Sequence, residues 1–115
     1  MTHYVSTTIE AYGNRVTKKD DRLVRMFRAL GHPNRFRLFA EIAKEGERAY
    51  QGGHYCFLHT IMERLDVGAP TVSHHLKELV HAELITTERQ GKFVTCRANP
   101  EALGLLSQFF GRPVS

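Results

Sequence analysis

The chain has 115 residues, of which 42% are hydrophobic and 24% charged, and its formal net charge is +4. This length fits one domain with one modest core, and no apolar run approaches the ~20 residues that a membrane span needs. Two cysteines are too few for a disulfide framework, and the N-terminus does not resemble a secretory signal. We therefore expect a cytoplasmic protein without a membrane segment, and its positive charge weakly favours a polyanionic partner.

The first part of the chain divides into an arm and two helices. Residues 1–17 show no clear hydrophobic period and are assigned to an N-terminal arm, whereas residues 18–111 are assigned to one domain. Thr17 is a good N-cap for a first helix that ends before Gly31. A second helix begins at Pro33 and is predicted to end at Gly46. The polar segment 47–55 then either lengthens that helix or forms a flap.

Two short amphipathic helices follow, joined by a turn at residues 66–69. In the second one, the apolar residues Val72, Leu76 and Leu79 form one stripe, while hydroxyl, imidazole and ammonium groups occupy the opposite side. Such a pair is typical of a helix-turn-helix, whose second helix enters the DNA major groove. Spacing alone leaves open an ordinary helical domain with a solvated polar face.

A β-hairpin is predicted directly after these helices. Residues 83–88 and 92–97 have strand character, and residues 89–91 are predicted to form the turn between them. A helix-turn-helix followed by a hairpin with a basic tip is a winged helix. Asn99 and Pro100 then open a last helix that runs to Phe110. The predicted fold is therefore mainly α with a small β-hairpin.

Three motifs, in this order, resemble those of the ArsR/SmtB family of dimeric, ligand-responsive transcriptional repressors. Residues 29–38 (ALGHPNRFRL) are similar to the family pattern A-L-x-x-P-x-R, and residues 70–77 read PTVSHHLK, as in the family. Residues 91–94 (GKFV) resemble the wing. The resemblance spans residues 20–110 and implies a homodimer that binds an inverted-repeat DNA operator and is released by an inducer.

The DNA-contacting residues expected from these motifs lie on the recognition helix, on the wing and near the start of the second helix. Lys77 and the wing cations are expected to contact phosphates, whereas Thr71 and His74 can reach base edges. His75 flanks the core stripe and is expected to be half-buried and bonded to backbone. Arg35 and Arg37 either contact phosphate or pair with Glu41. The full set is Thr71, Ser73, His74, Lys77, Arg89, Gln90, Lys92 and Arg35.

Dimerisation is predicted through the first and last helices, because a 115-residue monomer could hardly cover both of their apolar stripes. Packing of these helices across a two-fold axis would bury both stripes and set the two recognition helices ~34 Å apart, one turn of DNA. A monomeric core that closes over both stripes is the alternative. The predicted interface residues are Leu23, Met26, Phe27, Leu30, Leu103, Leu106, Phe109 and Phe110.

The nature of the inducer stays open at this stage. His54, Cys56 and His59 suit Zn, Ni or Cu, with His3 or His32 as a candidate fourth ligand. The last helix carries no His, Cys or Asp, so a zinc site there is not expected. Thiol oxidation of Cys56, with or without Cys96, is the second option, and a protein that senses nothing through these residues is the third.

Two other classes of protein compete with a DNA-binding regulator. An enzyme built on Cys56 and His59 is not expected, because no third orienting residue, carboxylate pair or Gly-rich loop accompanies them. A winged helix that binds only proteins is the stronger rival. A steep loss of DNA affinity with salt would separate the two classes, because only phosphate contacts produce it.

Overall fold

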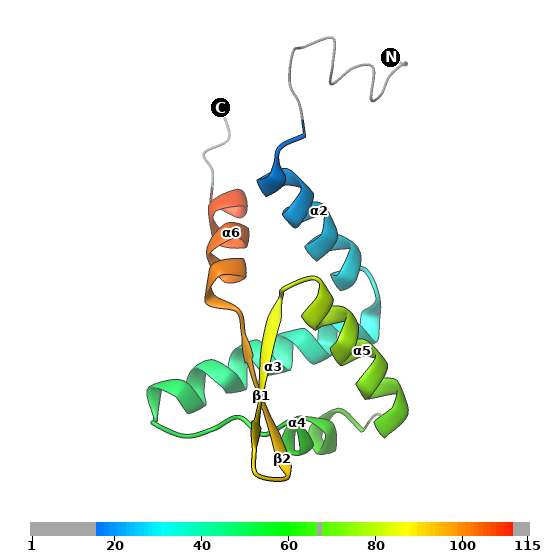
Figure 1. Ribbon diagram of the computed structural model, residues 1–115, viewed down its shortest axis with the longest axis vertical. Helices are drawn as coiled ribbons and strands as arrows, with labels where there is room; N and C mark the ends of the chain where they lie inside the picture. The colour runs from blue at the N-terminus through cyan, green and yellow to red at the C-terminus, as the bar shows by residue number, and fades with distance from the viewer. Residues whose placement is uncertain (1–15, 67, 112–115) are drawn as a thin grey trace.

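The computed structural model describes residues 16–66 and 68–111, so the predicted arm lies almost wholly outside the described residues. Within this part, helices and a two-stranded hairpin form the predicted winged helix-turn-helix (Figure 1). No described helix has the length and apolarity needed to cross a lipid bilayer. The elements are α2 (Lys18–Leu30), α3 (Pro33–Gln51), α4 (Leu58–Leu65), α5 (Ala69–His81), β1 (Ile85–Gln90), β2 (Phe93–Ala98) and α6 (Pro100–Phe110).

The predicted helix starts are confirmed by their capping contacts. The Thr17 hydroxyl accepts a hydrogen bond from the Asp20 amide at 3.0 Å, and the Asp20 carboxylate accepts one from the Thr17 amide at 3.1 Å. This reciprocal pair satisfies two amides that the first turn of α2 cannot use. Asn99 caps α6 in a similar way, through its side-chain oxygen and the Glu101 amide.

Helix α3 is longer than predicted, because it continues through Gly46 to Gln51. A single glycine costs a helix only about 1 kcal/mol, and here it has a packing reason. A Cβ at Gly46 would lie 3.4 Å from the Arg97 Cα, so the missing side chain lets α3 pack closely on β2. Of the two options for residues 47–55, most of the segment thus lengthens the helix.

The helix-turn-helix is formed by α4 and α5. Helix α4 ends at Asp66, which adopts a left-handed conformation with φ of 54°, one that Asp tolerates better than most residues. Helix α5 starts at Ala69, within the predicted turn, and Pro70 lies in its first turn. Val67, also part of that turn, lies outside the described residues.

The hairpin is shifted relative to its prediction. Strand β1 includes Arg89 and Gln90, which were expected in the turn, and the turn consists of Gly91 and Lys92. Gly91 has φ of 65°, and two-residue hairpin loops favour glycine in such a conformation because it matches the twist of the strands. At the other end, Glu83 has φ of 60° and still belongs to the turn that follows α5.

The core joins every described layer of the fold. Its fully buried side chains come from α2, α3, α4, α5, α6 and the start of the hairpin, so the second helix of the helix-turn-helix is fixed to the body by hydrophobic contacts. A β-bridge between Phe57 and Thr95 also ties the start of α4 to the wing. The largest fully buried side chains are Met26, Leu38, Ile42, Ile61, Leu79, Leu84 and Ile85.

Candidate nucleic-acid interface

Helix α5 separates its side chains as the sequence pattern predicts. Val72 and Leu79 are buried in the core, while Thr71, Ser73 and Lys77 are exposed. His74, the fourth residue expected to contact DNA from this helix, is also exposed. The outward face therefore presents hydroxyl, imidazole and ammonium groups, which can bond to base edges and phosphates.

The wing carries the other predicted contacts. Arg89 is exposed on β1, Lys92 is exposed in the turn, and Gln90 is half-buried. The Lys92 ammonium lies 5.7 Å from the centre of the Phe93 ring, a cation–π distance. Two cations are thus available to a polyanion at or beside the hairpin turn.

Arg35 is half-buried and bonds within its own chain. Its Nη1 donates to the Ala29 carbonyl at 3.2 Å, and its Nε donates to His75 Nδ1 at 3.5 Å. The predicted pairing with Glu41 is not observed, because Glu41 bonds to Arg64 and Lys44 instead. Half-buried Arg35 therefore links the end of α2 to the recognition helix, and its contact with DNA stays a prediction.

His75 is more buried than expected, and its partner is a side chain rather than the backbone. Only 5% of the residue is exposed. Burial lowers the pKa of its imidazole, and the neighbouring His32, Arg35 and His74 add to the effect. The neutral ring can accept the Arg35 hydrogen bond, which an imidazolium could not. Neutral His75 is thus part of what orients α5.

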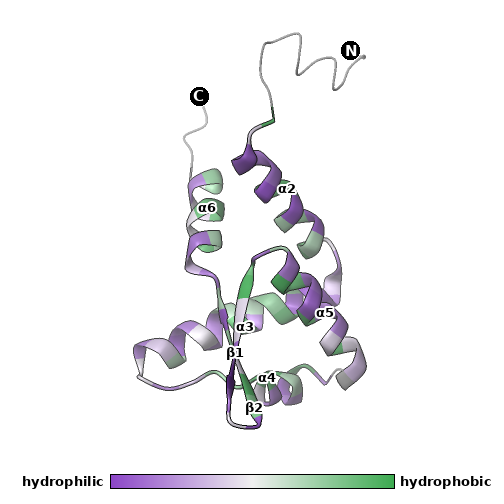
Figure 2. Ribbon diagram, viewed as in Figure 1, coloured by the Kyte–Doolittle hydropathy of each residue, from purple (hydrophilic) through white to green (hydrophobic). Residues whose placement is uncertain are grey.

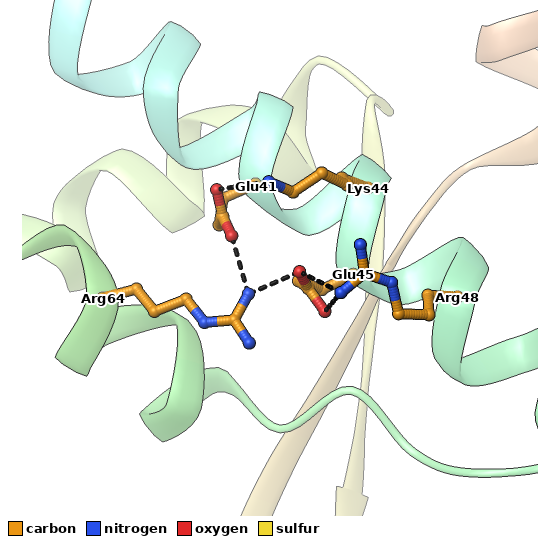
Figure 3. A network of polar contacts seen from close by, with 5 residues as sticks. All are labelled: Glu41, Lys44, Glu45, Arg48 and Arg64. Carbon is orange, nitrogen blue, oxygen red and sulfur yellow. Dashed lines mark hydrogen bonds and ion pairs between the residues drawn. The ribbon is translucent and has the colours of Figure 1, made fainter.

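Sequence patterns did not reveal the ion-pair network that holds α4 on α3 (Figure 3). Arg64 of α4 contacts Glu41 at 2.9 Å and also bonds to Glu45, and Arg48 contacts Glu45 at 3.2 Å. The bond from Arg64 lowers the pKa of Glu45, and the two carboxylates raise the pKa of Arg64. The spacing of acids and bases along α3 was the only sequence signal for this network, since its central residue, Arg64, comes from another helix.

The three predicted metal ligands are not brought together. His54 and Cys56 line a common pocket, whereas the His59 ring lies 5.1 Å from Phe93 and stacks on Phe57. Across residues 16–66 and 68–111, no three His, Cys, Asp or Glu side chains gather so as to hold a metal ion. His32 packs against His75 instead, and His3 lies outside the described residues. Among the described residues the predicted ligand set is therefore not assembled, and a metal-ion inducer stays a prediction.

Cys56 and Cys96, in contrast, lie next to each other. The Phe57–Thr95 bridge is antiparallel, which sets Cys56 directly opposite Cys96, and the Cys96 amide donates to the Cys56 carbonyl at 2.9 Å. A side-chain hydrogen bond between them lowers the pKa of the Cys56 thiol. The same bond, together with burial, raises the pKa of the Cys96 thiol. One thiol is thus easier to ionise than the other.

Helices α2 and α6 extend from the body at the end opposite the hairpin turn (Figure 1). Hydrophobic residues lie along α6 (Figure 2). Phe27, Phe109 and Phe110 form a ring cluster with centroids 5.2–5.8 Å apart. All three are exposed, Phe110 by 70%. Leu103 is exposed and Leu30 and Leu106 are half-buried, but Leu23 and Met26 are buried in the protein's own core. Those two predicted interface residues therefore belong to the core, because they lie on the side of α2 that faces it.

Comparisons with known proteins agree with this geometry. Residues 30–88 match the family model described as helix-turn-helix domain. None of the curated proteins matches the sequence significantly. The chain is similar in structure to an ArsR-family transcriptional regulator, with 21% identity, coverage of 79% of this chain and 84% of that one, and a TM-score of 0.58.

Two further solved structures have the same fold. The homodimeric winged helix-turn-helix DNA-binding domain of a possible ArsR-family regulator from Mycobacterium bovis has 16% identity, a TM-score of 0.60, and coverage of 96% of this chain and 87% of its own. The transcriptional repressor BigR from Xylella fastidiosa has 16% identity, a TM-score of 0.58, and coverage of 97% and 100%. The chain belongs to the helix-turn-helix domain family and has the winged-helix fold of ArsR-type transcriptional regulators.

Proposed function

We propose that the protein is a homodimeric transcriptional repressor that binds an inverted-repeat operator and releases it in response to an inducer. The observation that carries the proposal is the exposed polar face of α5, with Thr71, His74 and Lys77 outward, beside a wing with two exposed cations. A recognition helix can enter the major groove only if this face is free. The similar fold of BigR, a transcriptional repressor, supports the direction of regulation.

The proposed dimer explains the apolar surface on α2 and α6. An exposed cluster of three phenylalanine rings is unusual for a monomer in water, and a second copy of the chain would cover it across a two-fold axis. The similar domain from Mycobacterium bovis is described as homodimeric. A two-fold axis at this end would present two copies of α5 to successive turns of one DNA duplex.

Replacing Lys77 with alanine is expected to weaken binding to the operator and to unrelated duplex by similar factors. A dimer loses two phosphate contacts, so the slope of log K against log salt should fall in magnitude by about 2. Fluorescence anisotropy with operator and scrambled duplexes at several salt concentrations measures both quantities.

Lys44→Ala is the matched control, because Lys44 is also exposed but lies on α3 and pairs with Glu41. Both variants remove the same charge, so an equal loss in the two would show only a general charge effect. A change in base preference with Lys77→Ala at unchanged salt slope contradicts the phosphate contact. A wild-type protein that shifts no DNA at low salt supports the protein-binding module instead.

The arrangement of Cys56 and Cys96 favours thiol oxidation as the inducing event. Residues directly opposite in an antiparallel pair have Cα atoms about 4.5–5.5 Å apart, within the range of a disulfide. The pKa of the Cys56 thiol is lowered, and its thiolate attacks an oxidant such as hydrogen peroxide to give a sulfenic acid and one water. Cys96 then attacks the sulfenic acid and displaces a second water. Two thiols and one peroxide thus give one disulfide and two waters. The bond would fix the start of α4 to the wing.

Replacing Cys56 with serine is expected to abolish release of the operator by mild peroxide while leaving operator affinity in reducing buffer unchanged. In Cys96→Ser, Cys56 should still be oxidised to the sulfenic acid, but the intrachain disulfide should not form. Mass spectrometry of the denatured protein detects the bond: without alkylation the oxidised chain is two mass units lighter than the dithiol, and after alkylation it carries no alkyl group on either cysteine. An intact peroxide response in Cys56→Ser would remove this thiol from the sensor.

A further inference from the structure

An open pocket of about 560 Å³ lies between the C-terminal half of α3, the segment that leads to α4 and the wing. We call it the α3–wing pocket, and Tyr50, Tyr55, Thr86, Thr87, Glu88 and Arg97 are the lining residues that matter below. Its volume falls within the range of small-molecule sites. No residue of α5 lines it, so the pocket is separate from the face expected to read DNA.

Arg97 is the unusual group in this pocket. Its guanidinium carbon lies 3.8 Å from the centre of the Tyr50 ring, so the two planes hold each other in place. Its Nε is buried and has no hydrogen-bond partner among the described residues. Arg97 also takes part in none of the ion pairs that those residues form. A buried donor without an acceptor costs free energy, and folded proteins normally satisfy such groups.

The chemistry of a fitting ligand follows from these neighbours. The two Nη groups of a guanidinium form an edge with two parallel N–H donors, and a carboxylate accepts both at once. Tyr50 and Tyr55 are each 60% exposed and offer ring surface for a planar apolar body. Glu88 adds a negative charge to the same pocket, so a ligand with a second negative group would be repelled.

We propose that the α3–wing pocket binds a small aromatic monocarboxylate. Arg97 holds its carboxylate, Tyr50 and Tyr55 pack against its ring, and Thr86 and Thr87 contribute to the remaining wall. This binding does not depend on the function proposed above. If the protein is the regulator proposed, the ligand would bridge the wing and the segment that enters α4, two parts that must keep their relative position for DNA contact.

Benzoate is the test ligand, benzamide its neutral isostere, and inorganic phosphate the simple anion. We expect millimolar benzoate to produce a saturable shift of the Arg97 Nε–Hε resonance and of the Thr86 and Thr87 amide resonances in ¹⁵N spectra. Benzamide should bind at least about tenfold more weakly, because it forms no charge-assisted pair. Terephthalate, with its second carboxylate, should also bind more weakly than benzoate.

Arg97→Lys keeps the charge but loses the planar two-donor edge, so benzoate binding should fall by at least about tenfold. Arg89→Lys is the matched control: Arg89 lies on the same hairpin but outside the pocket, and its replacement should leave benzoate binding unchanged. Tyr50→Leu removes a ring that is 60% exposed together with its stacking on Arg97. It should also weaken benzoate binding, so it provides a second test if the Arg97 variant unfolds. Unchanged amide resonances in the core show that each variant is folded.

The proposal is overturned by the absence of a saturable shift with benzoate, by equal binding of benzamide, or by unchanged benzoate binding in Arg97→Lys or Tyr50→Leu. Phosphate that binds as tightly as benzoate would show a general anion site and also overturn it. These spectra are recorded without DNA, so their failure leaves the operator measurements untouched. Likewise, a failure of operator binding would not contradict the proposed benzoate site.

Discussion

Phe110→Asp is expected to convert the dimer into a monomer and to abolish operator binding at nanomolar concentrations. Phe110 is 70% exposed within one chain, so the single protomer should keep its fold. In a two-fold interface each residue occurs twice, and loss of about 1.5–3 kcal/mol of burial per ring would then cost about 3–6 kcal/mol. That corresponds to a dimer dissociation constant about 10²–10⁴-fold higher.

Sedimentation velocity across a concentration series measures this change, and anisotropy with the full operator measures its consequence. The control is Tyr55→Asp, since Tyr55 is similarly exposed but precedes α4 and lies away from α2 and α6. It introduces the same charge and should leave the mass of the particle unchanged. A Phe110→Asp protein that sediments like wild type would refute the interface, and a wild-type monomer would refute the dimer itself.

Ile61→Ala should destabilise the protein by about 2–5 kcal/mol, because it leaves a cavity where a fully buried side chain of α4 was. Ile61 has 0% exposure and packs in the core that α4 shares with α3 and α5. For a domain of this size, the melting temperature should fall by at least about 8 °C. Thermal and urea denaturation monitored by circular dichroism measure the loss, and an unchanged m-value would show that the unfolded state is the same.

Ile61→Val provides the graded comparison, with an expected loss of about 0.5–1.5 kcal/mol, since only one methylene is removed. At temperatures where both variants are folded, the operator affinity should be close to wild type, because Ile61 is buried and is not on the face proposed to read DNA. An Ile61→Ala protein as stable as wild type would mean that α4 does not depend on this core.

The architecture was predictable because local signals agreed with one another. The Thr17 cap, the Pro33 and Pro70 helix starts and the Asn99–Pro100 opening each marked a true boundary. The stripe of α5 also identified which of its side chains point outward. These signals depend only on residues three or four positions apart, so the chain itself contains them.

The predictions that failed involve partners distant in the sequence. Gly46 suggested a helix end, but its lack of a side chain serves the packing of α3 on β2. Likewise, pairing with Glu41 on its own helix was one of the two roles predicted for Arg35, whereas its observed side-chain partner is His75, 40 residues away. Leu23 and Met26 matched an interface stripe, yet only the position of the core decides which side of α2 is covered. Spacing within one element cannot show what lies across from it.

The strand pairing at Phe57 and Thr95 has a consequence for which substitutions this part of the fold can accept. The tie between the wing and α4 runs through main-chain groups, including the 2.9 Å bond from the Cys96 amide to the Cys56 carbonyl. Main-chain bonds persist when side chains are exchanged. Side chains at the neighbouring positions can therefore be exchanged without breaking the main-chain link between the wing and α4.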